Sequence, residues 1–148
     1  MTLRLYVHIP FCVRKCPYCD FNSHVRRRID WARFTCALLA ELEAQAERWA
    51  LSGRRLASVF FGGGTPSLAP PELIRAVLIR AQALFPPVGT LEVTLEANPG
   101  ASDAARFAAY REAGVNRLSI GVQSFSDARL QRLGRIHTAC DAHRMRYG

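Results

Sequence analysis

The chain carries, at residues 8–23, the stretch HIPFCVRKCPYCDFNS, which continues an apolar run at residues 3–9. Within it, Cys12, Cys16 and Cys19 form a C-x3-C-x2-C triplet. Iron–sulfur clusters are usually held by four cysteine thiolates. Three thiols on one short loop can instead bind three irons of a cubane and leave the fourth iron open. The triplet therefore favours a cluster that does chemistry on a bound molecule over one that only stores electrons.

A structural zinc site is the alternative for the same loop, with His8 or His24 as a fourth ligand. Zinc motifs usually present their ligands as two separated pairs. The sequence has no second pair, so the spacing favours the cluster and leaves zinc as the weaker alternative.

The composition indicates one globular domain. The chain has 148 residues, of which 49% are hydrophobic and 22% charged, as in ordinary folded domains. Five cysteines, three of them clustered, do not suggest a disulfide framework, and Cys36, in an apolar helical stretch, is expected in the core. No apolar run approaches the roughly 20 residues of a membrane span. The N-terminus lacks a signal-peptide pattern, so we expect a cytoplasmic location.

The net charge is +8, and 19 of the 20 basic residues are arginine. Most of them are scattered along expected helices, and the only dense run is Arg26, Arg27 and Arg28. Nucleic-acid modules usually show a recognisable fold or interleaved aromatic residues, and the sequence shows neither. We therefore expect these arginines to lie mostly on solvated helix faces, and we expect no nucleic-acid partner.

Strand-like and helix-like segments alternate along the chain. The expected strands are residues 3–9, 57–61, 91–96 and 117–121. The expected helices are residues 31 to about 51, about 70 to 84, about 103 to 113, and 126–133. Ser102 or Asp103 is expected to cap the third of these helices. A further helix is expected after residue 138. This alternation predicts an α/β fold with a parallel sheet of about four βα units. The motifs follow the carboxyl ends of the strands, where βα barrels collect their working residues.

Five stretches, in this order, resemble radical S-adenosylmethionine (SAM) enzymes of the oxygen-independent coproporphyrinogen III oxidase family and the related haem chaperone branch, HemW. They are YVHIPFCVRKCPYC at 6–19, FFGGGTPSL at 60–68, LEVTLEANPG at 91–100, GVNRLSIGVQSF at 114–125 and LGRIHT at 133–138. The resemblance implies a partial barrel of six βα units followed by a C-terminal domain. Residues 1–148 would then be the N-terminal part of the radical SAM core domain, an incomplete barrel.

The resemblance also implies the site. Cys12, Cys16 and Cys19 would hold a [4Fe–4S] cluster whose open iron binds SAM. The residues implied to contact SAM or a second ligand are Tyr6, Tyr18, Gly63, Gly64, Thr65, Glu96, Gln123 and Arg135. In the family, an electron from the cluster cleaves SAM to a 5′-deoxyadenosyl radical, and the cofactor carries that chemistry. No side chain is assigned as catalytic.

Phe21 separates the two branches of the family. The oxidase is expected to carry a fourth cysteine two positions after the third, where this chain has Phe21. The resemblance therefore favours the haem chaperone branch, with the oxidase and a truncated metal-binding remnant without turnover as alternatives. The implied partners are a porphyrin or haem ligand, whose haem site would lie outside this chain, and an electron donor such as a flavodoxin or ferredoxin.

Overall fold

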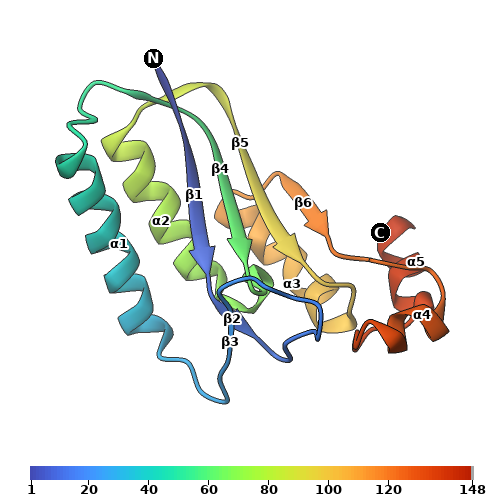
Figure 1. The fold of residues 1–148 in the computed structure, drawn as a ribbon. Coiled ribbons are helices and arrows are strands. Elements are labelled where there is room, and N and C mark those ends of the chain that lie inside the picture. Colours follow the sequence, from blue (N-terminus) through green and yellow to red (C-terminus); the bar gives the residue numbers. More distant parts are fainter. Residues whose placement is uncertain (148) are drawn as a thin grey trace.

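The computed structural model describes residues 1–147, apart from the side chains of residues 101–105 and 146–147. Its centre is a four-stranded parallel sheet with strand order β1-β4-β5-β6. The four strands are β1 (Thr2–Ile9), β4 (Arg55–Gly63), β5 (Pro87–Ala97) and β6 (Arg117–Ile120). Figure 1 shows all four strands running toward the same end of the molecule, which is where the loops after them gather. The predicted α/β fold with a parallel sheet is confirmed.

Helices cover one face of this sheet and leave the other face open (Figure 1). The covering helices are α1 (Trp31–Arg48), α2 (Pro71–Leu84) and α3 (Ala101–Ala113); the chain then ends with α4 (Asp127–Arg132) and α5 (Ala139–Tyr147). A single 3₁₀ turn, Pro66–Leu68, joins β4 to α2. Because α2 lies between α1 and α3 and packs on both, the helices form one continuous layer.

Strand alternation explains why only one face is buried. In β1, Val7 and Ile9 are buried, whereas Arg4 and Tyr6 on the opposite face are exposed. Successive side chains of a strand point to opposite faces, so the buried set meets the helices and the exposed set lines the open face. The largest buried side chains between sheet and helices include Leu56, Phe61, Leu73, Ile74, Leu95 and Tyr110.

The expected element boundaries differ from the structure in several places. Strand β4 is longer than predicted, because Gly62 and Gly63 still pair with His8 and Ile9 of β1. Strand β5 starts earlier, at Pro87, and helix α1 ends earlier, at Arg48. Helix α3 begins at Ala101 with Gly100 as its cap, so the expected cap at Ser102 or Asp103 is wrong.

The expectation that Cys36 lies in the core is also wrong, because its side chain is exposed. Helix α1 packs through Trp31, Phe34, Leu38 and Leu42. These positions recur every three or four residues and form one apolar stripe. Cys36 is two residues from Phe34 and from Leu38, and therefore faces away from the sheet.

A second, two-stranded sheet was not expected from the sequence. Strands β2 (Phe11–Cys12) and β3 (His24–Val25) pair in parallel, with Cys12 opposite Val25. This short pairing holds the two ends of the cysteine loop side by side.

Candidate functional site

A cavity of about 390 Å³ lies at the carboxyl ends of the strands. It is lined by all three clustered cysteines and by seven of the eight residues expected to contact SAM, namely Tyr18, Gly63, Gly64, Thr65, Glu96, Gln123 and Arg135. Tyr6 is the exception; it lies on the open face of the sheet and is 57% exposed. The structure thus brings together residues that are up to 123 positions apart in the sequence.

The cysteine loop is held in shape by hydrogen bonds across its base and interior. The backbone N–H of His24 donates to the carbonyl of Pro10 over 2.7 Å, and that of Cys19 donates to the carbonyl of Cys16 over 3.0 Å. Lys15 Nζ donates to the carbonyl of Phe21 over 3.2 Å. Cys12 is buried, while Cys16 and Cys19 are half-buried, so the three thiols span the loop from its base to its surface.

His8 connects the end of β1 to the same loop. Its Nε2 lies 2.8 Å from the carbonyl oxygen of Asn22, and its Nδ1 lies 3.2 Å from the hydroxyl of Tyr6. A neutral ring with its proton on Nε2 satisfies both contacts, donating to Asn22 and accepting from Tyr6. The zinc alternative needs His8 or His24 as a ligand, and these contacts already use both nitrogens of His8.

Gly63 and Gly64 let the end of β4 pass close to the cysteine loop. A Cβ on Gly64 would lie 2.6 Å from the carbonyl oxygen of Phe11 and 2.9 Å from Cys12 Sγ. Gly63 has φ +117°, which favours glycine, and its N–H donates to Glu96 Oε2 over 3.1 Å. Only glycine fits such a close approach, so the backbone itself forms this wall of the cavity.

Arg135 lies at the centre of a polar network that joins three elements. Its Nη2 donates to Asn98 Oδ1 over 2.6 Å and to the carbonyl of Gly121 over 2.7 Å. Its Nη1 lies 3.5 Å from Cys16 Sγ. Asn98 Nδ2 in turn donates to Thr65 Oγ1 over 3.3 Å. The loop before α5 is thereby tied to the ends of β5 and β6 and to the cysteine loop.

Asn98 is the main site residue that the sequence analysis did not assign. Its signal was present, since it follows β5 two positions after Glu96 in LEANPG. Residues directly after parallel strands gather at one edge of the sheet. An asparagine is also common as a turn residue. The position of Asn98 in the sequence therefore does not show whether it forms a turn or belongs to the site.

The pKa values of both expected tyrosines are raised. The partial burial of the Tyr6 side chain is the larger cause for its raised pKa, and the negative charge of Glu96 adds to it. Burial also raises the pKa of Tyr18, and Cys16 adds to this, while the Arg135 guanidinium acts in the opposite direction. Both phenols therefore stay protonated at neutral pH and can donate hydrogen bonds.

The donor set of the cavity fits an iron–sulfur cluster. Among the residues that the structure describes, no three His, Cys, Asp or Glu side chains converge on one point as a single metal ion requires. A cubane binds each thiolate through a different iron, so its ligands need not converge. Cys12, Cys16 and Cys19 face one cavity beside a glycine wall that leaves room for a ligand. These three residues would hold the cluster, and Gly63, Glu96 and Arg135, which line the same cavity, would contact its SAM.

The remaining histidines do not join the site. His137 is buried, with Nε2 3.0 Å from the carbonyl oxygen of Val122, and burial lowers its pKa. His143 packs against Phe125 with ring centroids 4.8 Å apart. His24 is exposed in β3. None was expected to be catalytic, and none lines the cavity.

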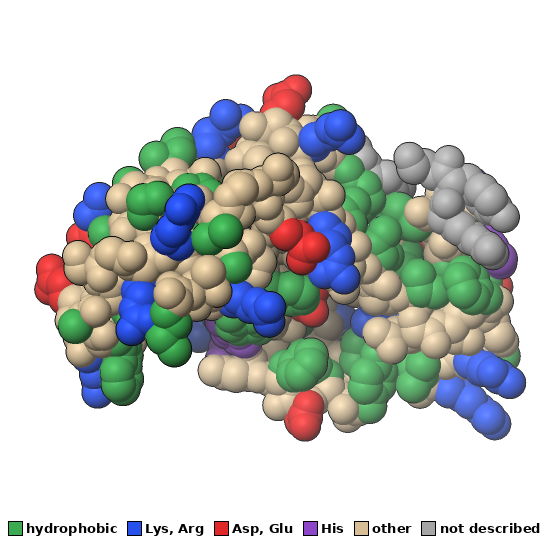
Figure 2. All heavy atoms as spheres, turned by 90° about the horizontal axis from the view of Figure 1, so that it is seen from above, with side chains coloured by type: hydrophobic (Ala, Val, Ile, Leu, Met, Phe, Trp, Pro, Cys, Tyr) green, Lys and Arg blue, Asp and Glu red, His purple; other side chains and the backbone are tan. Residues whose placement is uncertain are grey.

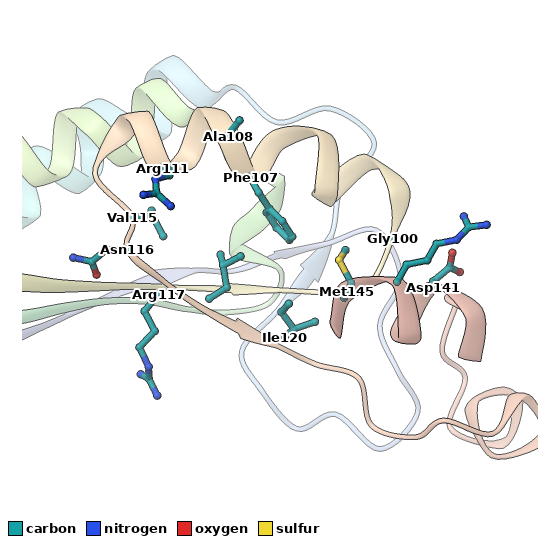
Figure 3. A pocket seen from close by; sticks show the side chains of 12 residues that line it. Gly100, Phe107, Ala108, Arg111, Val115, Asn116, Arg117, Ile120, Asp141 and Met145 are labelled. Carbon is teal, nitrogen blue, oxygen red and sulfur yellow. The ribbon is translucent and has the colours of Figure 1, made fainter. Parts of the chain in front are cut away.

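A larger cavity, of about 740 Å³, lies away from these residues along the free edge of β6. Figure 3 shows Phe107 from α3, Ile120 from β6 and Met145 from α5 pointing into it, while Arg117 points away from it. Its floor is apolar and holds none of the expected site residues. The larger of the two cavities is therefore not the one that the expected site residues line.

Comparison with known proteins defines the class. Residues 6–144 match the Radical SAM superfamily, and the chain belongs to this superfamily. It is 48% identical over 143 residues to "Heme chaperone HemW" from Haemophilus influenzae, covering 95% of this chain and 37% of that protein. It is 47% identical to the protein of the same description from Escherichia coli, and this match covers 96% of this chain and 37% of that protein.

Two further relatives widen the comparison. A bovine protein described as "Radical S-adenosyl methionine domain-containing protein 1, mitochondrial" is 52% identical over 140 residues, covering 93% of this chain and 31% of that protein. The solved structure of coproporphyrinogen III oxidase (HemN) from Escherichia coli, a radical SAM enzyme, superposes with a TM-score of 0.82 at 29% identity. The match covers 95% of this chain and 32% of that one. The chain thus spans about a third of the length of these relatives.

None of the helices within residues 1–147 combines the length and apolar character needed to cross a membrane.

Proposed function

We propose that this chain binds a [4Fe–4S] cluster and SAM in the 390 Å³ cavity and works in haem handling, most like the haem chaperone HemW. The observation that carries the proposal is the convergence of the three cysteines with Gly63, Glu96 and Arg135 on one cavity. Cluster and SAM together supply one-electron reductive chemistry when bound. The relatives at 47–48% identity support the haem chaperone branch.

The roles of the protein residues follow from their positions. Arg135 places its guanidinium Nη1 3.5 Å from Cys16 Sγ, so a fixed positive charge lies beside one of the three sulfurs that would hold the cluster. Glu96 holds Gly63 through its Oε2 and keeps Oε1 as an acceptor for ligand hydroxyls. Gln123, which has a φ of +63°, contributes a polar side chain to the lining of the cavity. Together these residues position a polar, zwitterionic ligand beside the cysteines.

The second candidate is an oxygen-independent coproporphyrinogen III oxidase, favoured by the structural neighbour at TM-score 0.82. Against it stands Phe21, which is 58% exposed at the cavity where the oxidase is expected to have cysteine. A porphyrin or haem ligand, a haem site outside this chain and a cytoplasmic location remain parts of the proposal.

The experiment that tests the proposal is anaerobic reconstitution with iron and sulfide, followed by electron paramagnetic resonance of the reduced chain with and without SAM. We expect a [4Fe–4S]⁺ signal that changes when SAM is added, because an open iron accepts the ligand. A Cys12→Ser/Cys16→Ser/Cys19→Ser variant should give no signal, and the matched Cys36→Ser/Cys140→Ser variant should keep it. A chain that binds zinc and forms no cluster would contradict the proposal.

The oxidase and chaperone candidates separate in a second assay. An oxidase converts coproporphyrinogen propionates to vinyl groups under reducing conditions with SAM, which chromatography of the porphyrins detects. We expect no such conversion by this chain. Conversion of coproporphyrinogen by this chain would contradict the haem chaperone hypothesis and support the oxidase.

A further inference from the structure

Thr65 lies against Cys12, the most deeply buried of the three clustered cysteines. Its backbone N–H donates to the carbonyl of Phe11 over 2.8 Å, which holds the residue beside the start of the cysteine loop. Its hydroxyl Oγ1 lies 3.7 Å from Cys12 Sγ, and the hydroxyl donates to this sulfur. Both side chains are buried, so bulk water does not compete for the contact.

The hydroxyl of Thr65 has one hydrogen, and the neighbouring Asn98 decides where that hydrogen points. Asn98 accepts from Arg135 Nη2 over 2.6 Å, and because a guanidinium has only donors, the amide oxygen must face Arg135. This turns Asn98 Nδ2 toward Thr65 Oγ1, 3.3 Å away. An amide nitrogen also only donates. Thr65 Oγ1 therefore accepts from Asn98, and its own hydrogen is left to point at Cys12 Sγ.

We call Arg135, Asn98 and Thr65 the donor relay. Its hydrogen bonds run in one direction, from the guanidinium through the amide to the hydroxyl, and they end on Cys12. Hydrogen bonds in such a chain polarise and strengthen one another. The same guanidinium places Nη1 3.5 Å from Cys16 Sγ. Two of the three clustered sulfurs therefore face donors that belong to one network.

The donor relay differs from the charged groups at the far end of the molecule. Figure 2 views the end where the strands begin, and there Lys and Arg side chains are interspersed with Asp and Glu on the surface. Salt screens exposed charges of this kind. In the donor relay, Thr65 is buried, while Asn98 and Arg135 are half-buried. Its effect on the sulfurs is therefore local and only weakly dependent on salt.

From these contacts we infer that Asn98 is a positioning residue, which aims the Thr65 hydroxyl at Cys12 and thereby raises the reduction potential of the cluster. The inference rests on the proposed function, because the donor relay acts on a cluster only if the three cysteines hold one. Reduction adds one electron from a low-potential one-electron donor and takes the cluster from the 2+ to the 1+ state, with no bond made and no proton moved. A donor hydrogen beside a cysteine sulfur stabilises the added negative charge, and hydrogen bonds to the sulfurs are among the factors that set cluster potentials.

The first measurement is the reduction potential of the reconstituted chain without SAM, so that ligand binding does not enter. Thr65→Val removes the hydroxyl and keeps the shape of the side chain. We expect the ratio of reduced to oxidised cluster at a fixed potential to fall by about threefold to tenfold, where tenfold corresponds to about 59 mV for a one-electron couple. Thr65→Ser keeps a hydroxyl and should restore the potential of the parent chain. If Thr65→Val loads no cluster, Thr65→Ala replaces it.

Thr94→Val is the matched control. Thr94 is a buried threonine of β5 whose Oγ1 accepts from Arg117 Nη1 over 3.2 Å, and it does not line the cavity of the cysteines. The control makes the same chemical change and should leave the potential as it is. The difference between Thr65→Val and the parent chain should also persist at high salt. Equal shifts in Thr65→Val and Thr94→Val would assign the effect to general loosening of the sheet and overturn the inference.

Asn98→Asp tests the positioning role itself. A carboxylate still accepts from Arg135, but its second oxygen also only accepts, so the Thr65 hydrogen turns away from Cys12 toward the carboxylate. Thr65→Val should then shift the potential of the parent chain and hardly shift that of the Asn98→Asp chain. The added negative charge is present in both chains of the second comparison and cancels. Shifts of equal size in the two backgrounds would show that Asn98 does not aim the hydroxyl, and the inference would be wrong.

A second measurement needs no cluster. In the cluster-free chain, the side-chain amide signals of Asn98 in a nuclear magnetic resonance spectrum should move in Thr65→Val and stay in place in Thr94→Val. Unchanged signals in Thr65→Val would overturn the inference. If the parent chain forms a cluster that responds to SAM but Thr65→Val has the parent's potential, the donor relay has no effect and the proposed function stands. If the parent chain forms no cluster, the proposed function itself fails.

Discussion

Arg135 donates to Asn98 across 2.6 Å, and this bond joins the loop that precedes α5 to the end of β5, 37 positions earlier in the sequence. The same guanidinium reaches the carbonyl of Gly121 and lies 3.5 Å from Cys16 Sγ. One side chain therefore fixes the relative positions of the cysteine loop and two strand ends. Under the proposed function, these are the parts that a cluster and SAM would contact together.

Replacing Arg135 by methionine should loosen this junction. Hydrogen bonds that involve a charged group contribute about 1.5–3 kcal/mol each. Arg135 Nη2 donates two of them, so we expect the free energy of unfolding to fall by about 3 kcal/mol or more. The SAM-induced change in the resonance spectrum should also be lost. Arg132→Met, an exposed neighbour on α4, is the matched control and should keep both properties. Urea unfolding measures the first effect; an Arg135→Met chain as stable as the control would refute the role.

Gly64→Ala should block the cluster. A Cβ there would lie 2.9 Å from Cys12 Sγ and 2.6 Å from the carbonyl oxygen of Phe11. One of them must move, and overpacking of this kind costs about 1–3 kcal/mol. We expect low iron and sulfide content after reconstitution, measured by chemical analysis and absorbance.

The control for Gly64 is Gly53→Asn. A Cβ at Gly53 meets nothing within 4 Å. Its φ of +75° is one that asparagine tolerates. This variant should load its cluster like the parent chain. Full cluster loading of Gly64→Ala would show that the loop has more freedom at Cys12 than the structure indicates.

The alternation of strand and helix patterns predicted the parallel sheet, because that alternation is a local signal. The residues expected around the cavity came instead from the resemblance to a known family. Alternating strand and helix patterns place the strand ends at one edge, and the glycine and cysteine motifs are contiguous. The Arg135–Asn98 contact depends on how distant segments pack, which no local pattern specifies. The same reason explains the β2–β3 pairing, whose two-residue strands are too short to give a periodic signal.

Cys36 shows a different limit of the sequence. Its neighbours Ala37, Leu38 and Leu39 are apolar, so composition placed it inside. Which face of α1 meets the sheet is decided by the stripe of Trp31, Phe34 and Leu38, and Cys36 lies off that stripe. Periodicity, applied position by position, would have corrected this prediction.

His137 should make stability depend on pH near neutrality. Burial is the main cause that lowers its pKa from the usual 6.5, and the nearby Arg135 charge acts the same way; the carbonyl of Val122 and Asp141 oppose them. The folded chain therefore binds this proton more weakly than the unfolded chain does. The contribution of His137 to the free energy of unfolding is fully present above pH 6.5, the pKa of the unfolded chain. This contribution is lost as the pH falls from 6.5 toward the lower pKa that His137 has in the folded chain.

Urea unfolding of the parent chain and of His137→Gln between about pH 8 and about pH 5 measures this dependence. Glutamine can still donate to the carbonyl of Val122 but does not titrate. We expect the parent to lose stability over this range more steeply than the variant. Asp141, whose pKa is lowered by hydrogen bonds from Thr138, acts only at more acidic pH and does not confound the comparison. Parallel profiles would contradict the assignment to His137.

The apolar groove beside β6 should bind a hydrophobic dye. Phe107, Ile120 and Met145 line a cavity of about 740 Å³ (Figure 3), and exposed apolar surface of this kind enhances the fluorescence of anilinonaphthalene sulfonate. Met145→Glu places a charge in the groove, so the enhancement should fall severalfold. Ile79→Glu is the matched control, because Ile79 is a solitary exposed residue on α2 at 63% exposure. Equal fluorescence enhancement in the two variants would mean that the dye binds a partly unfolded chain and not the groove. Circular dichroism at the same temperature would detect such unfolding directly.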